Sequence, residues 1–423
     1  MSPVTLTQCR TKALSLYQSI TADPNFNGSN YWQIGCVFDT MTDYLQQDAG
    51  FPDPNVTVAE VDAFIRNTYD HYQSLTQQGT TAPNQACFAW YDDFGWWGIA
   101  SAKAFLPSYA QVFLGYAREY QKIALSTWEI MKNGKLDEVH FGAPNAWTRC
   151  DQTTFAICEP RFPGGVWQYD IFADQRPYEA APFNPSTPIA VGNYQPATLG
   201  PYQMSVVNGL YFVLANRLQA AGYERPETTA AIFGFFNSWF HDLSLDDKTR
   251  LNLSVNGGQL ILERVSTYKD PNNKVYWADG TTCWGGDQGL VFGALAEYKR
   301  QHGGPAWIDD MLTAILGGVA TSMSSGSYMM PWYPLQNNKL QTADAGDYSS
   351  GVGVYMRYLN QAYGFDSLVQ TSLDTAQNPM RELVLDSAQT VCDGNLPDWG
   401  NPLFASFNEL AILVAAISLL KNS

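Results

Sequence analysis

The stretch Ser205-Val-Val-Asn-Gly-Leu-Tyr-Phe-Val-Leu-Ala215 has apolar or small residues on nearly every side of the helix that its period predicts. The stretch Gly289-Leu-Val-Phe-Gly-Ala-Leu-Ala296 has the same character. A helix of this composition is stable in water only when other elements surround it. The two stretches therefore predict a layer of buried helices.

The segment from Val58 to Leu75 predicts a second kind of helix, with one face in solvent. Its apolar residues recur at three and four positions: Val61, Phe64, Ile65, Tyr69 and Tyr72. Its charged residues fall between them: Glu60, Asp62, Arg66 and Asp70. Helices of the two kinds alternate along the chain, which indicates two layers.

Twelve helices are predicted, at about 4–20, 31–47, 57–76, 88–105, 108–132, 202–221, 226–242, 285–301, 305–323, 350–363, 366–388 and 403–421. Six hairpins with the buried helices inside form an all-α (α/α)6 toroid, a six-hairpin barrel. We therefore predict a single domain over residues 1–423. A stack of helical repeats is the alternative, although no fixed repeat period is visible.

Two inserts interrupt the helical pattern. The first, residues 134–200, is rich in Pro, Gly, Trp and Tyr, and long loops of this kind are usually functional. The second runs from Leu253 to Cys283, and its Asn256-Gly257-Gly258 predicts small hairpins. Each insert precedes a buried helix, so we expect both to lie at one rim of the toroid, with the functional site.

The charge balance limits the partners. The 423 residues carry 24 Lys and Arg against 40 Asp and Glu, a net charge of −16, and no basic run is present. Such a surface repels nucleic acid and anionic membranes. The longest apolar run, from Leu410 to Leu420, is too short to span a bilayer, so we expect no membrane insertion. We also expect the protein to be a monomer. The start of the sequence lacks a signal peptide, which leaves a cytoplasmic protein or a mature exported one.

Cysteine and histidine spacing gives no support for a metal or a cofactor. The seven cysteines include no C-x-x-C pair, and only four histidines occur, so we expect neither a metal ion nor a cofactor. Two disulfides remain open if the protein is exported, Cys150–Cys158 and Cys36–Cys87, with free buried thiols as the alternative.

Chemistry is most strongly indicated at Ala89-Trp-Tyr-Asp-Asp-Phe-Gly-Trp-Trp-Gly-Ile-Ala100. Asp92 and Asp93 lie among aromatic rings in a helix that ought to be free of charge. One interpretation is a helix start, with one Asp as the N-cap. The second is a pair of glycosidase carboxyls, since retaining enzymes hold two about 5–5.5 Å apart and their proximity separates the two pKa values.

Aromatic residues that could stack on sugar rings are plentiful near this pair and in the inserts. The candidates for substrate binding are Trp90, Tyr91, Trp97, Trp167 and Trp284. Core packing is the alternative for each of them.

Five landmarks together resemble glycoside hydrolase family 76, the endo-acting α-1,6-mannanases of the (α/α)6 superfamily. They are Trp90–Gly98, Gly164-Gly165-Val166-Trp167, Ser205–Tyr211, Asp287-Gln288-Gly289 and Gly351–Leu359. The resemblance implies hydrolysis of an α-1,6-mannan-type chain, with Asp92 as nucleophile and Asp93 as general acid/base. It also implies that Asn208, Asp287 and Gln288 bind the substrate.

One departure concerns specificity. This chain has Gly286-Asp287-Gln288-Gly289 where the family usually has Tyr-Asn-Gln-Gly. A third carboxyl at this position could recognise a different hydroxyl pattern or an amino sugar, or it could act as a helix cap.

Three further functions are compatible with a toroid of this kind: a transglycosylase, a sugar epimerase and a non-catalytic sugar-binding protein. An epimerase commonly needs paired histidines for its proton transfers. In this chain the histidines are scattered: His71, His140, His241 and His302. A binding protein would need no acid pair, so the two adjacent aspartates favour an enzyme.

Overall fold

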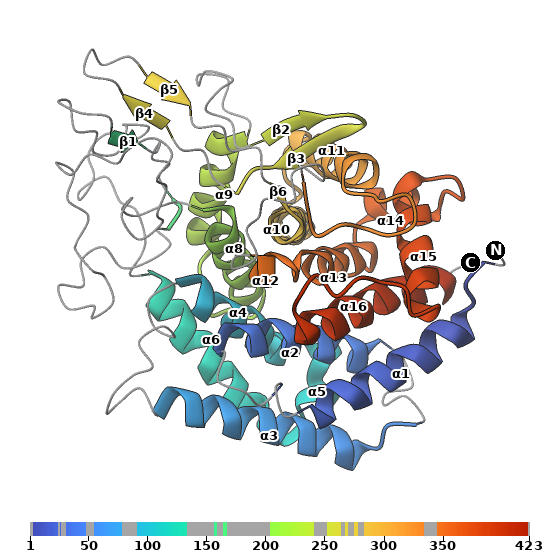
Figure 1. The fold of residues 1–423 in the computed structure, drawn as a ribbon. Coiled ribbons are helices and arrows are strands. Elements are labelled where there is room, and N and C mark those ends of the chain that lie inside the picture. Colours follow the sequence, from blue (N-terminus) through green and yellow to red (C-terminus); the bar gives the residue numbers. More distant parts are fainter. Residues whose placement is uncertain are drawn as a thin grey trace.

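The computed structural model consists mainly of helices (Figure 1). It describes residues 3–23, 26, 31–47, 55–77, 91–132, 156–158, 164–166, 204–240, 252–263, 267–269, 275–277, 283–333 and 345–421. The all-α class predicted from the sequence is confirmed in this part of the chain.

Six helices, which we call the inner ring, pack in a closed cycle. They are α2 (Tyr31–Gln46), α4 (Tyr91–Ala102), α8 (Ser205–Ala220), α10 (Gly285–His302), α13 (Gly351–Tyr363) and α16 (Pro402–Lys421). Each contacts the next, and α16 contacts α2. In α2, every residue from Ile34 to Leu45 is buried, including the charged Asp39 and Asp43, because the helix is surrounded by its neighbours in the ring.

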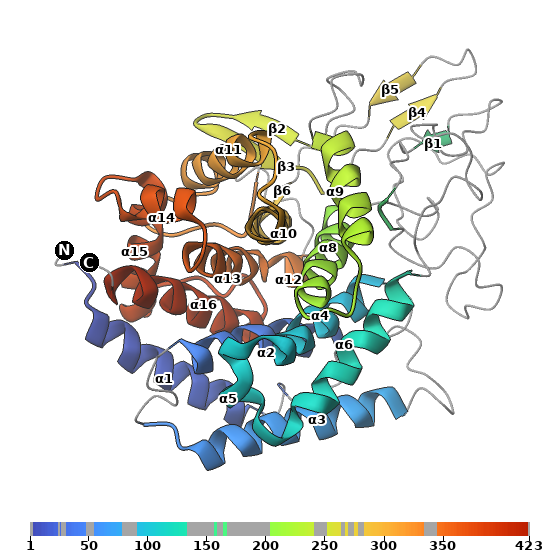
Figure 2. The ribbon, with the colours of Figure 1, turned by 180° about the vertical axis from the view of Figure 1, so that it is seen from behind.

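A second set of helices covers the inner ring (Figures 1 and 2). It comprises α1 (Leu6–Ala22), α3 (Val58–Gln77), α6 (Ala117–Lys132), α9 (Pro226–Phe240), α11 (Trp307–Ser322) and α15 (Pro379–Cys392). The buried residues of α15 recur at three and four positions: Met380, Leu383, Val384, Ser387, Ala388 and Val391. The predicted alternation of buried and amphipathic helices is therefore confirmed.

Two of the predicted helices are broken. The segment predicted as a helix over 108–132 contains η4 (Pro107–Tyr109), α5 (Ala110–Phe113) and η5 (Leu114–Tyr116) before α6, because the backbone of Leu114 turns to a φ of 35°. The short α5 contacts both α3 and α2 (Figure 2). The helix predicted over 366–388 is split into α14 (Ser367–Asp374) and α15, since Pro379 starts a new helix capped by Asn378.

The second insert forms the predicted hairpins. Strands β2 (Asn252–Val255) and β3 (Gly258–Ile261) pair around Asn256-Gly257, where Gly257 has a φ of 79° that suits glycine. Strands β4 (Thr267–Lys269) and β5 (Val275–Trp277) pair with each other, and β1 (Ala156–Cys158) of the first insert pairs with β4. The sequence did not predict a third sheet, formed by β6 (Cys283–Trp284) and β7 (Trp332–Tyr333).

The starts of the inner helices meet at one end of the ring. Trp32 near the start of α2 lies 5.5 Å from Phe404 of α16 and 6.0 Å from Trp96 of α4, measured between ring centroids. Trp96 in turn lies 6.3 Å from Trp284, which precedes α10. The carboxyl-terminal ends of the same helices therefore lie at the opposite end of the ring.

A buried ion network joins three inner helices. Asp39 of α2 pairs with Arg357 of α13, with 3.1 Å between Oδ2 and Nε, and with Lys103. Lys103 follows α4 in η3 (Lys103–Phe105) and lies 2.6 Å from Asp43 Oδ1. These side chains are at most 4% exposed, so each charge depends on its partners.

Four of the described cysteines are thiols. Cys9, Cys36, Cys283 and Cys392 are free, so Cys36 does not form the bridge considered from the sequence. Burial raises the pKa of the Cys36 thiol to about 12, which makes it unreactive. Its considered partner Cys87 lies outside the described residues, as does Cys150 of the other pair.

Within the described residues, one helix, α16, is long and apolar enough to span a bilayer. In its most apolar window, 67% of the residues are buried inside the protein, where α16 packs on α1, α2, α13 and α15. Its composition is therefore that of a central core helix.

Replacing Lys103 with methionine tests the ion network. Removing one buried partner leaves uncompensated carboxylates, so we expect Lys103→Met to lower the free energy of unfolding by about 3–5 kcal/mol. Lys122→Met is the control, because Lys122 is 76% exposed and its ion pair with Glu119 spans 4.0 Å. Urea denaturation measures both variants, and equal small losses would contradict the assigned role.

Candidate active site

Helix α4 begins with the predicted carboxylate pair. Asp92 and Asp93 are its second and third residues and are half-buried. Both aspartates lie within helix α4, so neither is its N-cap. The positive end of the helix dipole favours negative charge in this first turn. The fold thus holds two adjacent carboxyls at the start of an inner helix.

The carboxyl of Asp93 is held toward its neutral form. Burial raises the pKa of Asp93 well above its ordinary value, and the charges of Asp92 and then Asp347 raise it further. Two neighbouring carboxyls in a poorly solvated site cannot both ionise easily. The site therefore favours a proton on Asp93 beside Asp92.

Asp287, the third residue of α10, adds another carboxyl. It is fully buried, and burial, followed by the charges of Glu263 and Asp92, raises its pKa well above the usual range. The N-cap of α10 is Trp284, so the capping role considered for Asp287 is wrong. Among the described residues neither carboxyl oxygen of Asp287 has a hydrogen-bond partner. Its charge interaction with Asp92 links the starts of α10 and α4.

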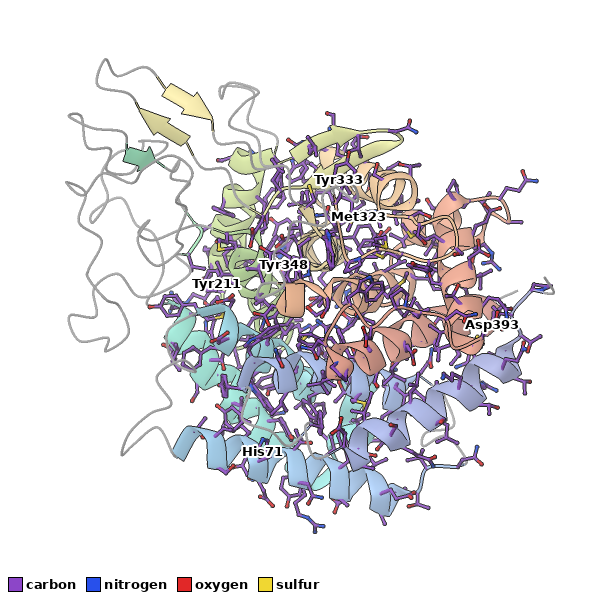
Figure 3. The ribbon with its side chains drawn as sticks, in the orientation of Figure 1. His71, Tyr211, Met323, Tyr333, Tyr348 and Asp393 are labelled. Carbon is purple, nitrogen blue, oxygen red and sulfur yellow. The ribbon has the colours of Figure 1, made fainter. Side chains whose placement is uncertain are left out.

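A hydrogen-bonded frame surrounds these carboxyls. Tyr348, the last residue of α12 (Ala345–Tyr348), donates from its hydroxyl to Glu263 Oε1 at 2.7 Å and is labelled near the centre of Figure 3. Trp284 Nε1 donates to the carbonyl of Tyr348 at 3.0 Å. Gln33 Nε2, near the start of α2, donates to Asp347 Oδ1 at 3.2 Å. Sequence analysis did not find Glu263, Asp347 or Tyr348, because no motif marks them.

A glycine allows α10 and α13 to meet closely at this end. A Cβ on Gly351 would lie 2.4 Å from the carbonyl oxygen of Pro331 and 2.7 Å from Trp284 Nε1. Any larger residue would push these elements apart and would move Trp284.

Asn208 and Gln288, predicted to bind substrate, are fully buried and bind backbone instead. Asn208 Oδ1 accepts from the Val166 N–H at 2.8 Å, and its Nδ2 donates to the Val166 carbonyl at 3.1 Å. Gln288 makes the same pair of bonds to Ile261, each 2.7 Å long. The two amides attach the first and second inserts to the ends of α8 and α10 that lie near the carboxyls.

The predicted aromatic residues have different environments. Trp97 is fully buried and donates from Nε1 to the carbonyl of Tyr31 at 2.7 Å, and Tyr91 is 3% exposed, so both pack in the core. Trp284 is 7% exposed and lies edge-on to Trp96 and Tyr348. Trp90 and Trp167 lie outside the described residues. In the described ranges no group of three or more His, Cys, Asp or Glu side chains is arranged to hold a metal ion.

Gln288→Leu tests the attachment of the second insert. The change leaves the buried N–H and C=O of Ile261 unpaired, at about 1–3 kcal/mol for each group, so we expect a clear loss of stability. Hydrogen exchange at Ile261 should become faster. Gln389→Leu is the control, because the Gln389 side chain donates to nearby Asp393 on the surface. We expect this variant to melt at the wild-type temperature. Wild-type exchange at Ile261 in the first variant would contradict the assignment.

Asp287→Asn tests the buried carboxyl through pH. The folded protein binds this proton more tightly than the unfolded chain does, so stability falls as pH rises from the unfolded pKa to the raised folded pKa. The isosteric amide cannot ionise. We therefore expect the variant to melt higher than wild type at neutral pH and to lose less stability between pH ~4 and neutrality. Asp310→Asn, at an exposed position of α11, is the control, and an identical pH profile for all three proteins would refute the claim.

Comparisons by sequence identify no relative. No protein-family model matches the chain, and no curated protein matches it.

Comparison with solved structures finds whole-chain similarity. The GH76A α-1,6-mannanase of Salegentibacter sp. HEL1_6 matches with a TM-score of 0.60 and 14% identity, over 98% of this chain and 99% of that one. Dfg5 from Chaetomium thermophilum, in complex with glucosamine, matches with a TM-score of 0.53 and 13% identity, over 98% and 90%. The GH76 α-mannanase BT2949 of Bacteroides thetaiotaomicron matches with a TM-score of 0.53 and 11% identity, over 97% and 95%. The resemblance seen in the sequence motifs is thus confirmed in three dimensions, and the chain has the fold of the family 76 α-1,6-mannanases.

Proposed function

We propose that the protein is a retaining glycoside hydrolase that cleaves an α-linked glycan, an α-1,6-mannan-type chain. The observation that carries the proposal is the adjacent, half-buried pair at the start of α4, where burial and the charge of Asp92 raise the pKa of Asp93 well above its ordinary value. A glycosidase needs such a pair, one carboxylate to attack and one acid to protonate the leaving oxygen.

The proposed architecture is an (α/α)6 toroid that forms a single domain over residues 1–423. The closed cycle of inner helices and the outer helices packed on it support this assignment. The described parts of both inserts bond to the starts of α8 and α10, which supports a site at that rim.

In the proposed mechanism, Asp92 attacks the anomeric carbon while Asp93 gives its proton to the departing glycosidic oxygen. This step yields a covalent glycosyl-enzyme and a carboxylate at Asp93. Asp93 then takes a proton from water, which attacks the anomeric carbon and releases Asp92. Each residue returns to its starting protonation state.

The structural neighbours support the substrate class. The Salegentibacter enzyme was also solved as an inactive variant in which two adjacent aspartates are replaced by asparagine, in complex with α-1,6-mannotriose. An adjacent Asp pair in the same fold is what Asp92 and Asp93 provide here. A carbohydrate partner therefore suits this chain.

Asp287 favours a second candidate specificity, for a glycan that presents a hydroxyl or an ammonium group to a third carboxyl. Its oxygens have no hydrogen-bond partner among the described residues, and a donor from the substrate would satisfy them. An amino sugar fits this chemistry, and Dfg5 was solved with glucosamine. Substrate profiling of wild type and Asp287→Asn separates this specificity from that for a neutral mannan.

Asp92→Asn and Asp93→Asn test the mechanism. We expect each to lower hydrolysis of α-1,6-linked mannotetraose by orders of magnitude, roughly 10³-fold or more, with little loss of folding. Azide should restore turnover of an activated substrate by Asp93→Asn only, since it replaces the base-assisted water. Asp62→Asn is the control, because Asp62 lies on the outer helix α3 and not at the start of an inner helix. Turnover by either variant at the wild-type rate would rule out the assigned roles.

A further inference from the structure

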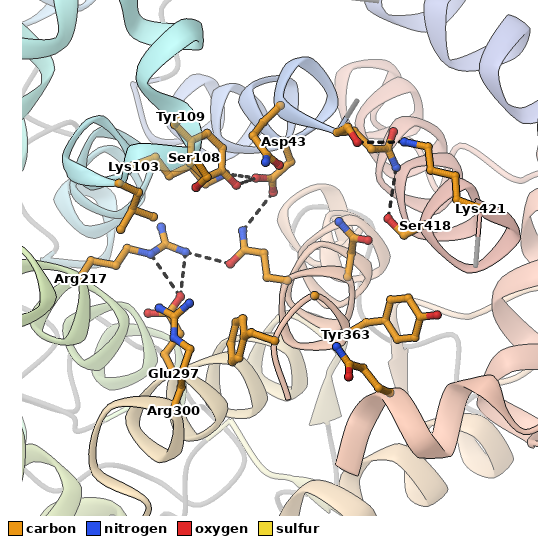
Figure 4. A pocket seen from close by; sticks show the side chains of 18 residues that line it. Asp43, Lys103, Ser108, Tyr109, Arg217, Glu297, Arg300, Tyr363, Ser418 and Lys421 are labelled. Carbon is orange, nitrogen blue, oxygen red and sulfur yellow. Dashed lines mark hydrogen bonds and ion pairs between the residues drawn. The ribbon is translucent and has the colours of Figure 1, made fainter. Parts of the chain in front are cut away.

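A cavity of about 400 Å³ opens at the end of the inner ring opposite the carboxyl pair (Figure 4). It is lined from the carboxyl-terminal ends of inner helices: Asp43 and Gln47, Arg217, Glu297 and Arg300, Asn360 and Gln361, and Ser418 and Lys421. Lys103, Ser108 and Tyr109 line it from the segment after α4. Its size falls within the range of small-molecule sites, about 300–1,000 Å³.

The buried charges in its wall pair with one another. Lys103 lies 2.6 Å from Asp43 Oδ1, and Arg217 lies 3.3 Å from Glu297 Oε1. Gln361 joins the two pairs, because it accepts from Arg217 at 2.9 Å and donates to Asp43 Oδ2 at 3.1 Å. The dashed lines in Figure 4 trace this chain. The deep wall is therefore rigid and close to neutral.

The remaining polar groups suit a neutral ligand. The other lining side chains are mostly amides and hydroxyls: Gln46, Gln370, Asn360, Ser108 and Ser418. Glu297 Oε2 and Asn360 Oδ1 are buried acceptors with no hydrogen-bond partner among the described residues, so the wall has two acceptors that a ligand hydroxyl would satisfy. Tyr363 and Phe365 add aromatic surface.

We propose that this cavity is a second binding site, separate from the carboxyl pair, for a small neutral polyol of mono- or disaccharide size. Sugar hydroxyls can donate to the two unpartnered acceptors of the wall, Glu297 Oε2 and Asn360 Oδ1. The buried charges already have partners, and the two exposed cations of the lining, Arg300 and Lys421, contact the Phe365 ring and the Gln47 carbonyl, so an ionic ligand gains little here. The site does not depend on catalysis at Asp92 and Asp93.

Ligand-observed NMR titration of the whole protein tests the proposal, with methyl α-mannoside and sucrose as neutral probes. Glucosamine and glucuronate are the cationic and anionic comparisons. We expect the neutral sugars to bind with a Kd of about 1 mM, a typical weak affinity, and the charged ones more weakly at this site.

Two variants assign the binding to this cavity. Ser108→Trp fills the mouth from an exposed position, with Ser108→Ala as its matched control, and Asn360→Leu removes an acceptor at nearly constant size. We expect the tryptophan and leucine variants to weaken neutral-sugar binding about tenfold or more, roughly 1.4 kcal/mol, Ser108→Ala to weaken it less than Ser108→Trp does, and Asp92→Asn to leave it unchanged.

Three results would overturn the proposal. The first is that neither neutral sugar binds. The second is that Asp92→Asn abolishes the binding, whereas Asn360→Leu and Ser108→Trp do not affect it. The third is that the cavity binds a charged sugar more tightly than a neutral one. Hydrolysis by wild type is measured in parallel, so that failure of the catalytic proposal is seen separately. If Ser108→Trp does not fold, Asn360→Leu still decides.

Discussion

The ion pairs of Asp39 are the constraint on which the inner ring depends. Burial on its own would raise the pKa of Asp39, but the charges of Arg357, then Lys103 and Arg217, hold that pKa below its usual value. The carboxylate therefore stays ionised in the core and needs its partners at contact distance. Because these partners come from different parts of the ring, the network limits how α2, α13 and the end of α4 can be placed.

The parallel arrangement of inner helices gives the ring two chemically different ends. Carboxyls gather where the helices start, at Asp92, Asp93 and Asp287, and basic side chains lie where they end, at Lys103 and Arg217. This distribution matches the helix dipoles. The carboxyls repel one another and favour protons, whereas the basic side chains pair with Asp43 and Glu297. The two ends of the ring therefore differ in how their charges are balanced.

The sequence by itself determined the helical class, the alternation of buried and amphipathic helices and the turn at Asn256-Gly257. The helices depend on the periodicity of apolar residues, and the turn depends on the backbone conformations that asparagine and glycine allow. Both can be recognised in a short stretch of sequence. It also placed Asp92 and Asp93 in a buried helix, because charge in an apolar stretch is visible without any contact. The break at Leu114 was missed, because the single glycine that follows it, Gly115, is a weak signal in an otherwise helical pattern.

Only the tertiary structure decided what the polar residues at the site do. Asn208 and Gln288 have motif-like positions in the sequence, yet their amides bind Val166 and Ile261, which are distant along the chain. Asp287 could be interpreted as a cap until its burial near Glu263 and Asp92 was known. Hydrogen bonds and pKa values depend on neighbours from other helices, and a linear sequence does not record which neighbours will meet.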